Sequence, residues 1–283
     1  LTMQLRPYQD RLANDIRSAF ASGARRPLAV SPTGSGKTVL FSYITSQVLK
    51  RGARVVIVAH RREILDQISG TLSKVSVPHG FIQAGKPMSK QPAMVASIQT
   101  LGRRLDQVTT PDLVIIDEAH HSVSKSYVEM FARWPDAKFI GVTATPERLD
   151  GKGLGTMFDR MVMGPSVQWL IDNGFLAKPV YYAPRETVDL SQVHTIAGDF
   201  DRSEAEEVVN TPRITGDAAT HYVRFCNRQR AVAFCISVAH AQQVADTFNS
   251  CGIPAASIDG TLEPEVRKQR VDDLTAGKIL VLT

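Results

Sequence analysis

The fold of this 283-residue chain is decided by one stretch, Ser31-Pro32-Thr33-Gly34-Ser35-Gly36-Lys37-Thr38, which follows a short apolar run and opens a segment of helical period. Successive backbone N–H groups in such a loop, added to the N-terminus of the helix, form a concave anion site. Gly34 and Gly36 let the backbone approach phosphate oxygens without a Cβ in the way. The Lys37 ammonium can reach the terminal phosphates, and the Thr38 hydroxyl can ligate Mg²⁺. The stretch predicts a phosphate-binding loop, with Ser31 where the general pattern has glycine.

The apolar runs around this loop predict a parallel sheet. Their apolar residues continue without alternation, as in strands that are buried on both faces. The expected strands are 28–31, 54–59, 94–97, 113–117 and 139–143, separated by helical patterns at 37–50, 63–75 and 124–134. Strand–helix–strand alternation of this kind predicts an α/β domain with right-handed crossovers. A short helix at 167–173 and one more strand at 178–183 are expected to follow.

Two carboxylates follow the apolar run at 113–116, namely Asp117 and Glu118. Ligands of open α/β sheets bind at the carboxyl ends of the strands, so we expect both acids on the same edge as the phosphate loop. Asp117 would hold Mg²⁺ through water, and Glu118 would orient the attacking water. An acidic turn after an ordinary strand would look the same in isolation. Together with the loop, however, the pair predicts a Mg²⁺-dependent nucleoside triphosphatase.

The alternation resumes in the last third of the chain. We expect helices at 211–227, 239–250 and 264–276 and strands at 231–236, 255–258 and 279–283, after a polar connection at 184–211. The predicted domains are therefore 1–183 and 184–283, and the second is incomplete because the chain stops inside a strand. Trp134 and Trp169 lie among aliphatic residues at helical spacing and are predicted to be core, as is Cys235 inside its strand.

The composition excludes several classes of protein. Apolar residues make up 43% and charged residues 22%, which argues against wholesale disorder. Three cysteines without a CxxC pair argue against a disulfide framework or a cysteine-rich zinc site. The longest aliphatic runs are far too short to span a membrane, and no secretory signal is visible. We expect a soluble cytoplasmic protein whose net charge of +5 permits a polyanionic partner.

The order of the motifs resembles that of a superfamily 2 helicase of the DEAH-box type, because Asp117-Glu118-Ala119-His120 spells the DEAH box. Four further segments resemble the adenine-reading, strand-binding and coupling motifs of that superfamily: Leu5-Arg6-Pro7-Tyr8-Gln9, Ala59-His60-Arg61-Arg62-Glu63, Ser97-Ile98-Gln99-Thr100-Leu101 and Thr143-Ala144-Thr145-Pro146. Within the superfamily, the combination is most similar to the RadD-like DNA helicases of bacteria and phages. The resemblance implies a P-loop NTPase with two RecA-like domains.

The resemblance also implies roles for individual residues. The expected catalytic residues are Lys37, Asp117, Glu118 and His120, with Mg²⁺ held by Thr38 and Asp117. The expected ATP contacts are Arg6, Gln9 and residues 32–38, the nucleic-acid contacts are Arg61, Arg62, Gln99 and Thr100, and Thr143 and Thr145 couple the two sites. Gln9 carries the donor and acceptor that adenine requires, and Arg6 could stack on the base. Simpler readings stay open: a capped helix start at Arg6 and Gln9, a solvated pair at Arg61 and Arg62, and a helix N-cap near Gln99.

These implications predict an ATP-dependent helicase or translocase that acts on DNA, with RNA as an alternative because phosphate-gripping groups read the sugar poorly. One alternative is the motor subunit of a restriction or repair complex that moves along duplex without unwinding it. Another is an ATP-gated nucleic-acid clamp. The pattern of the family continues beyond Thr283 with an arginine motif, and the chain opens on Leu1. We therefore expect a chain cut at both ends that hydrolyses ATP at close to the background rate.

Overall fold

The computed structural model describes residues 4–122, 124–146, 154–182, 194–196, 199–200, 204, 218–226 and 228–283. The chain forms two compact units, Leu1–Val180 and Tyr181–Thr283. The predicted domain boundary, after residue 183, lies outside the described residues. Among the described helices, none combines the length and the apolar composition that crossing a membrane would require.

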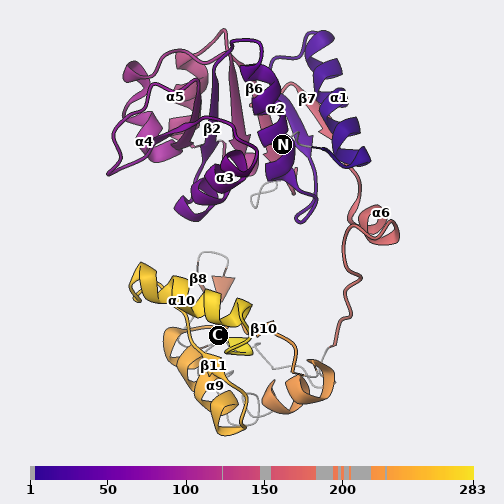
Figure 1. Ribbon diagram of the computed structural model, residues 1–283, viewed down its shortest axis with the longest axis vertical. Coiled ribbons are helices and arrows are strands. Elements are labelled where there is room, and N and C mark those ends of the chain that lie inside the picture. Colours follow the sequence, from indigo (N-terminus) through magenta and orange to yellow (C-terminus); the bar gives the residue numbers. More distant parts are fainter. Residues whose placement is uncertain are drawn as a thin grey trace. The chain divides into compact units, whose positions relative to one another are not determined.

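The first unit is built on a seven-stranded parallel sheet with the order β3-β4-β2-β5-β6-β1-β7 (Figure 1). The strands are β1 (Pro27–Val30), β2 (Val55–Ala59), β3 (Gly80–Ile82), β4 (Ala93–Ser97), β5 (Leu113–Asp117), β6 (Lys138–Thr143) and β7 (Arg160–Met163). Every neighbouring pair in this sheet is parallel. The predicted α/β fold with a parallel sheet is confirmed.

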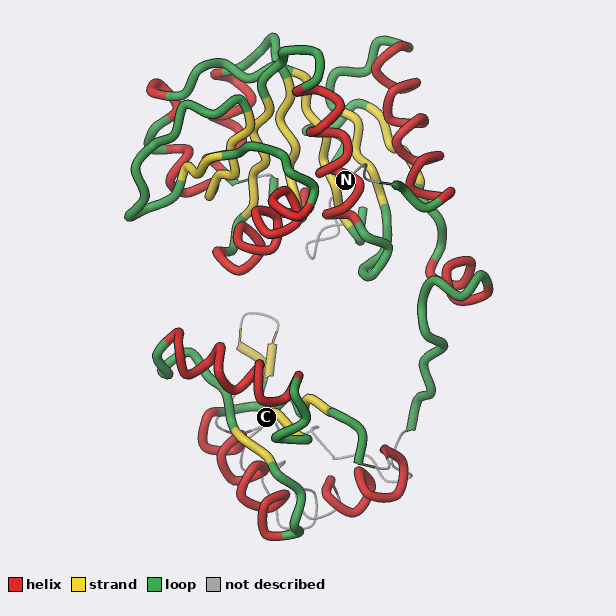
Figure 2. The backbone as a smooth tube through the Cα atoms, viewed as in Figure 1, coloured by secondary structure: helices red, strands yellow, loops and turns green. Residues whose placement is uncertain are grey.

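Helices cover both faces of this sheet and produce three layers (Figure 2). They are α1 (Pro7–Ala21), α2 (Lys37–Leu49), α3 (Arg62–Lys74), α4 (Ile98–Gly102) and α5 (Lys125–Arg133), with short 3₁₀ turns at Leu105–Gln107 and Ala119–His121. Helix α6 (Val167–Asp172) lies apart from these layers (Figure 1). Alternate residues of a strand point to opposite faces. Ile57 and Ile115 accordingly pack with α1, α2 and α3, whereas Val58 and Ile116 pack with α4 and α5.

Three predictions for the first unit were wrong or incomplete. Strands β3 and β7 were not predicted, because they are short and because Val162 is the only buried residue of β7. The expected strand at 178–183 is absent from residues 178–182, and residue 183 lies outside the described residues. Trp134 is fully buried as predicted, but Trp169 is 41% exposed.

The second unit contains a smaller parallel sheet with the order β10-β12-β11. Its described elements are β8 (Thr195–Ile196), β9 (Asp199–Phe200), a π-helical turn (Tyr222–Cys226), β10 (Ala231–Val232), α9 (Val238–Ser250), β11 (Ala255–Ala256), α10 (Pro264–Thr275) and β12 (Val281–Leu282). The two-residue strands are shorter than predicted, and Cys235 lies beyond β10 and is only half-buried. Most of 184–211 and the start of the expected helix at 211–227 lie outside the described residues.

Candidate functional site

The carboxyl edge of the seven-stranded sheet gathers most of the predicted site residues. Residues 31–38 follow β1, Asp117 ends β5, and Thr143 ends β6, which pairs with both β1 and β5. Because all these strands are parallel, their carboxyl ends meet at one edge. The structure therefore brings the phosphate loop, the acidic pair and the threonine motif together around β6.

The two loop glycines are required by geometry. Gly34 and Gly36 both have left-handed backbones, with φ near 81° and 80°, a region that is costly for residues with a Cβ. A Cβ on Gly34 would lie 2.7 Å from Leu176 Cδ2, and a Cβ on Gly36 would overlap the side-chain amide of Gln9. Glycine is thus needed both for the turn and for close packing.

Ser31, the departure from the general pattern, braces the loop from inside. Its buried hydroxyl lies 2.8 Å from the Ser35 hydroxyl, which donates to Pro32 O at 2.6 Å. The backbone N–H of Ser31 donates to Thr143 O, so the loop is also tied to β6. These bonds fix the loop before any ligand arrives.

The loop leaves donors free for an anion. Within the described part of the chain, the amides of Gly34, Gly36, Lys37 and Thr38 donate to no protein acceptor. Unpaired amides at the start of a thirteen-residue helix form an anion site that the helix dipole strengthens. Lys37 is half-buried, and the described residues offer its ammonium no ion-pair partner. Loop and lysine together fit a polyphosphate.

The segment before the loop supports the loop directly. Helix α1 begins at Pro7, and Gln9 Oε1 accepts the Arg6 N–H at 3.0 Å, as in a capped helix start. Gln9 Nε2 donates to Ser35 O at 3.0 Å, and the Tyr8 hydroxyl donates to the same oxygen at 2.9 Å. Gln9 is only 5% exposed. In this structure the Gln9 side chain caps α1 and holds the phosphate loop.

The acidic pair occupies the end of β5. Burial first, and then the neighbouring Glu118 carboxylate, raise the pKa of Asp117, against the lowering effect of the Glu118 N–H and the Lys37 charge. Glu118 has a left-handed backbone, with φ 48°, which is unusual for a residue with a long side chain. Among the described residues no cation is ion-paired with Asp117, and a buried carboxylate of this kind suits Mg²⁺, a hard ion that prefers oxygen ligands.

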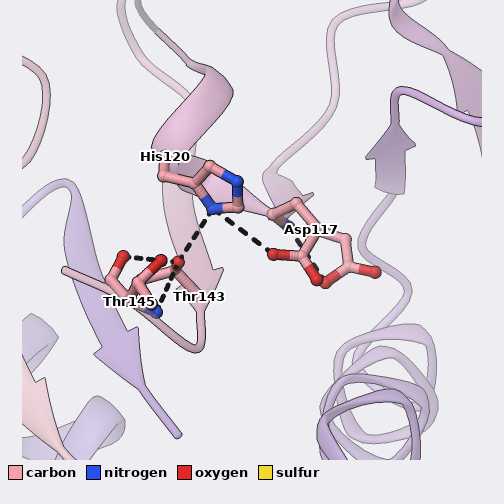
Figure 3. Close-up of polar contacts among 5 residues, drawn as sticks. Asp117, His120, Thr143 and Thr145 are labelled. Atoms are coloured by element: carbon pink, nitrogen blue, oxygen red, sulfur yellow. Dashed lines mark hydrogen bonds and ion pairs between the residues drawn. The ribbon is translucent and has the colours of Figure 1, made fainter. Parts of the chain in front are cut away.

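His120 connects the acidic pair to the threonine motif (Figure 3). Its Nδ1 lies 3.3 Å from Glu118 Oε2 and 3.2 Å from Thr143 Oγ1. The Thr143 hydroxyl donates its proton to Thr145 O at 2.8 Å and accepts the Thr145 N–H at 3.2 Å. Since that hydroxyl has one proton, the His120 Nδ1 must be the donor. His120 thus carries a proton that points at both Glu118 and Thr143.

The predicted nucleic-acid residues lie farther along the same edge, after β2 and β4. Gln99 Nε2 donates to His60 Nδ1 at 2.8 Å, and Gln99 Oε1 accepts the Ser97 hydroxyl at 2.6 Å, so the two strand ends are linked. Arg61 and Arg62 are exposed, and no ion pair holds either of them among the described residues. Thr100 is half-buried within α4, which begins at Ile98.

Two parts of the site were missed at the sequence level. The motif at residues 5–9 predicts no role for Tyr8, whose hydroxyl donates to Ser35 O in the loop. The residues after α6 pack against the loop through Leu176. The sequence feature that could have predicted this contact is Gly174. It ends α6 in a left-handed conformation (φ 72°) and reverses the direction of the chain.

Several proteins that are similar in sequence to this chain are helicases by name. The "51.5 kDa protein" of Lactococcus phage (isolate 7-9) is 31% identical over 89% of this chain and 53% of that protein. The "Putative ATP-dependent helicase IRC3" of Saccharomyces cerevisiae is 30% identical over 88% of this chain and 39% of that protein. The "Putative mitochondrial ATP-dependent helicase irc3" of Schizosaccharomyces pombe is 27% identical over 99% and 49%. The chain thus spans about half the length of the curated relatives it matches.

Solved structures and family models agree with these relatives. The Hef helicase domain of Pyrococcus furiosus has the same fold, with a TM-score of 0.59 and 15% identity over 98% of this chain and 85% of that one. The resemblance to the superfamily 2 helicases is confirmed at that level. The family model described as "Type III restriction enzyme, res subunit" matches residues 2–148, more than half of the chain. The chain therefore belongs to the ResIII family.

Proposed function

We propose that this chain carries the nucleotide site of an ATP-dependent helicase or translocase of the DEAH-box type, which couples hydrolysis of Mg·ATP to movement on DNA. One observation carries the proposal. The unpaired amides of Gly34, Gly36, Lys37 and Thr38 share an edge with a buried carboxylate, and only β6 separates the two strands that bear them. An anion site beside a carboxylate that suits Mg²⁺ fits a nucleoside triphosphate.

Each group has a defined task in this proposal. The loop amides and the Lys37 ammonium hold the phosphate chain, while the Thr38 hydroxyl and Asp117 supply oxygen ligands to Mg²⁺. When bound, Mg²⁺ neutralises charge that develops on the phosphate oxygens. Glu118 orients the attacking water, and its left-handed backbone fixes where the carboxylate points.

His120 and the threonine motif are proposed to transmit the state of the site. The His120 proton is shared between Glu118 and the buried Thr143 hydroxyl. Any change in the charge near Glu118 alters the hydrogen bond to Thr143 and, through it, the position of Thr145. Arg61, Arg62, Gln99 and Thr100 are proposed to grip the phosphates of a nucleic-acid strand.

The family match favours a second candidate, the motor subunit of a restriction complex that moves along duplex DNA without separating it. A RadD-like role in DNA repair remains the first candidate because of the motif combination that the sequence shows. The two differ in substrate. A strand-separating helicase should bind a single strand more tightly than a blunt duplex of equal length, and a duplex translocase should show the opposite order. Fluorescence anisotropy with both DNAs distinguishes them.

The nucleotide site is tested by calorimetric titration with Mg·ATP. Lys37→Ala removes the cation that faces the terminal phosphates, and we expect binding to weaken by about 2–4 kcal/mol, as for a lost charged hydrogen-bonding group. Lys50→Ala is the matched control, because Lys50 is an exposed lysine at the other end of α2. Equal ATP affinities for the Lys37→Ala and Lys50→Ala chains would refute the phosphate-loop assignment.

A further inference from the structure

Three aromatic rings lie beside the phosphate loop. Phe175 meets the Tyr8 ring edge-to-face with centroids 4.9 Å apart, and the Tyr8 hydroxyl bonds to Ser35 O in the loop. Phe175 also stacks on Trp169, with centroids 5.9 Å apart and an interplanar angle of 18°. We call Trp169 and Phe175 the aromatic wall. Its connection to the loop through Tyr8 places two large stacked rings next to the proposed phosphate site.

The local backbone fixes the wall in place. Helix α6 ends with Gly174 in the left-handed region, and the Gly174 N–H donates to Ile171 O while the Phe175 N–H donates to Leu170 O at 2.8 Å. This bond pattern is a Schellman stop, which reverses the chain after a helix. The reversal directs Phe175 toward Tyr8 and brings Leu176 against Gly34 of the loop. The wall is therefore positioned by backbone hydrogen bonds.

The wall has accessible aromatic surface and a cation in front of it. Trp169 is 41% exposed, while Phe175 is half-buried. The guanidinium carbon of Arg6, an exposed residue, lies 5.3 Å from the centroid of the Phe175 ring. Guanidinium groups and aromatic rings both stack on flat heterocycles. Arg6 and Phe175 thus present two facing planar groups, one of them on a long side chain that can move aside.

Gln9 is the residue that the sequence predicts to hydrogen-bond the base. Gln9, the residue predicted to read adenine, has its amide nitrogen bonded to Ser35 O and its amide oxygen bonded to Arg6 N. The Gln9 Nε2 group is also 3.4 Å from Gly36 O, so both of its N–H groups face the loop, and only a second lone pair on Oε1 remains for a base. Stacking on the wall leaves the Gln9 bonds in place and displaces only the Arg6 guanidinium from the Phe175 ring.

We propose that Trp169 and Phe175 form the face that receives the base of the bound nucleotide, with Arg6 on the opposite side of the base. This inference rests on the proposed function, since it assigns the base-binding part of the same site. Every base has a π-face, so the contribution of the wall is shared by purine nucleotides whatever their hydrogen-bonding edge. The wall therefore adds affinity for the base without distinguishing adenine from guanine.

The test compares Phe175→Ala with the parent chain in titrations with Mg·ATP, Mg·GTP and Mg²⁺ with inorganic triphosphate. We expect ATP and GTP to bind about 10-fold more weakly, as for loss of one base–aromatic stack, while triphosphate affinity stays unchanged. Phe175→Trp should restore nucleotide affinity. Tyr181→Ala is the matched control, because Tyr181 is an aromatic residue that is 87% exposed and makes none of these contacts.

The remaining outcomes overturn the proposal in separable ways. Unchanged ATP affinity in the Phe175→Ala chain would show that the wall does not receive the base. An equal loss for ATP and triphosphate would show that the wall only braces the phosphate loop. If the parent chain binds neither ATP nor triphosphate, the proposed function itself fails, and the wall fails with it.

Tryptophan fluorescence supplies a second measurement. The chain has two tryptophans, and Trp134 is fully buried, so Trp169 is the one that a ligand can contact directly. We expect Mg·ATP to quench the emission, and inorganic triphosphate to leave it unchanged. The quenching should vanish in Trp169→Phe. Identical spectra with ATP and with triphosphate would contradict a base stacked on the wall.

Discussion

The two ends of the carboxyl edge in the first unit are built differently. Around β1, β5 and β6, the groups are buried and already bonded to one another: Ser35 is 2% exposed, Thr143 is fully buried, and Asp117 is 7% exposed. After β2 and β4, Arg61, Arg62 and Gln99 are exposed. Fixed groups suit chemistry at one phosphate chain, where small displacements are costly. Exposed long side chains suit a polymer whose phosphates are gripped in many registers.

The largest expected effect belongs to the buried end. Glu118→Gln keeps the shape of the side chain but removes the carboxylate that orients water. In a protein that also carries the arginine motif of the family, we expect the variant to hydrolyse ATP about 100-fold more slowly, or slower still. Mg·ATP affinity should stay the same. Phosphate release in single turnovers, with protein in excess, measures the rate. Glu129→Gln, an exposed glutamate of α5, is the control. A wild-type rate in the Glu118→Gln chain would remove Glu118 from the water-orienting role.

An intermediate effect is expected at the exposed end. Replacing Arg61 and Arg62 by alanine should weaken binding of single-stranded DNA and reduce the slope of log affinity against log salt by about 1.4, since each lost phosphate contact contributes about 0.7. ATP affinity should not change. Fluorescence anisotropy over a salt series measures both quantities.

A matched control exists at the opposite edge of the sheet. Arg25 and Arg26 are also adjacent arginines, but they precede β1 and so lie at the amino ends of the strands. Their double alanine variant should retain the parent salt slope. If the salt slope decreases equally in both double variants, DNA binding depends on the overall charge of the chain and not on Arg61 and Arg62. The two ends of the carboxyl edge would then not be specialised.

The smallest expected effect concerns stability and pH. Burial, followed by the Glu118 charge, raises the pKa of Asp117, so the fold favours the protonated acid over the ionised one. Ionised Asp117 therefore destabilises the free chain at pH 7, and this cost fades as pH falls toward the ordinary aspartate pKa of about 3.9. Asp117→Asn should raise the Tm at pH 7, with a gain that shrinks in acid.

Differential scanning fluorimetry over about pH 4 to 8 measures this dependence. Asp136→Asn, at an exposed acid in the turn after α5, should show no such gain. A Tm for Asp117→Asn that is equal to or below that of the parent at every pH would mean that Asp117 is not destabilised by its surroundings.

The buried end of the edge was also the part that the sequence predicted best. The runs that became β2 and β5 are continuously apolar because both faces of these strands are covered by helices. The loop glycines and Asp117 follow such runs directly, so their position on the edge could be inferred. Strand β7 could not be inferred, because its apolar run, Met161–Met163, has only three residues and only Val162 is buried.

Tertiary contacts explain what the sequence could not predict. The aliphatic neighbours of Trp169 predict a core residue, but Trp169 is exposed and stacks on Phe175, six residues farther along the chain. Gln9 was assigned to a base, and only the folded chain shows its amide bonded to the phosphate loop. In the second unit, two-residue strands and an almost fully exposed Phe234 replaced the expected longer strands.

Hydrogen–deuterium exchange tests the central claim most directly, because it locates the bound nucleotide on the chain. The amides of Gly34, Gly36, Lys37 and Thr38 have no protein acceptor among the described residues, so they should exchange quickly in the free chain. The account predicts that Mg·ATP protects the segment 31–38, and that Lys37→Ala loses this protection. Protection that appears elsewhere while 31–38 exchanges at its free rate would contradict the account.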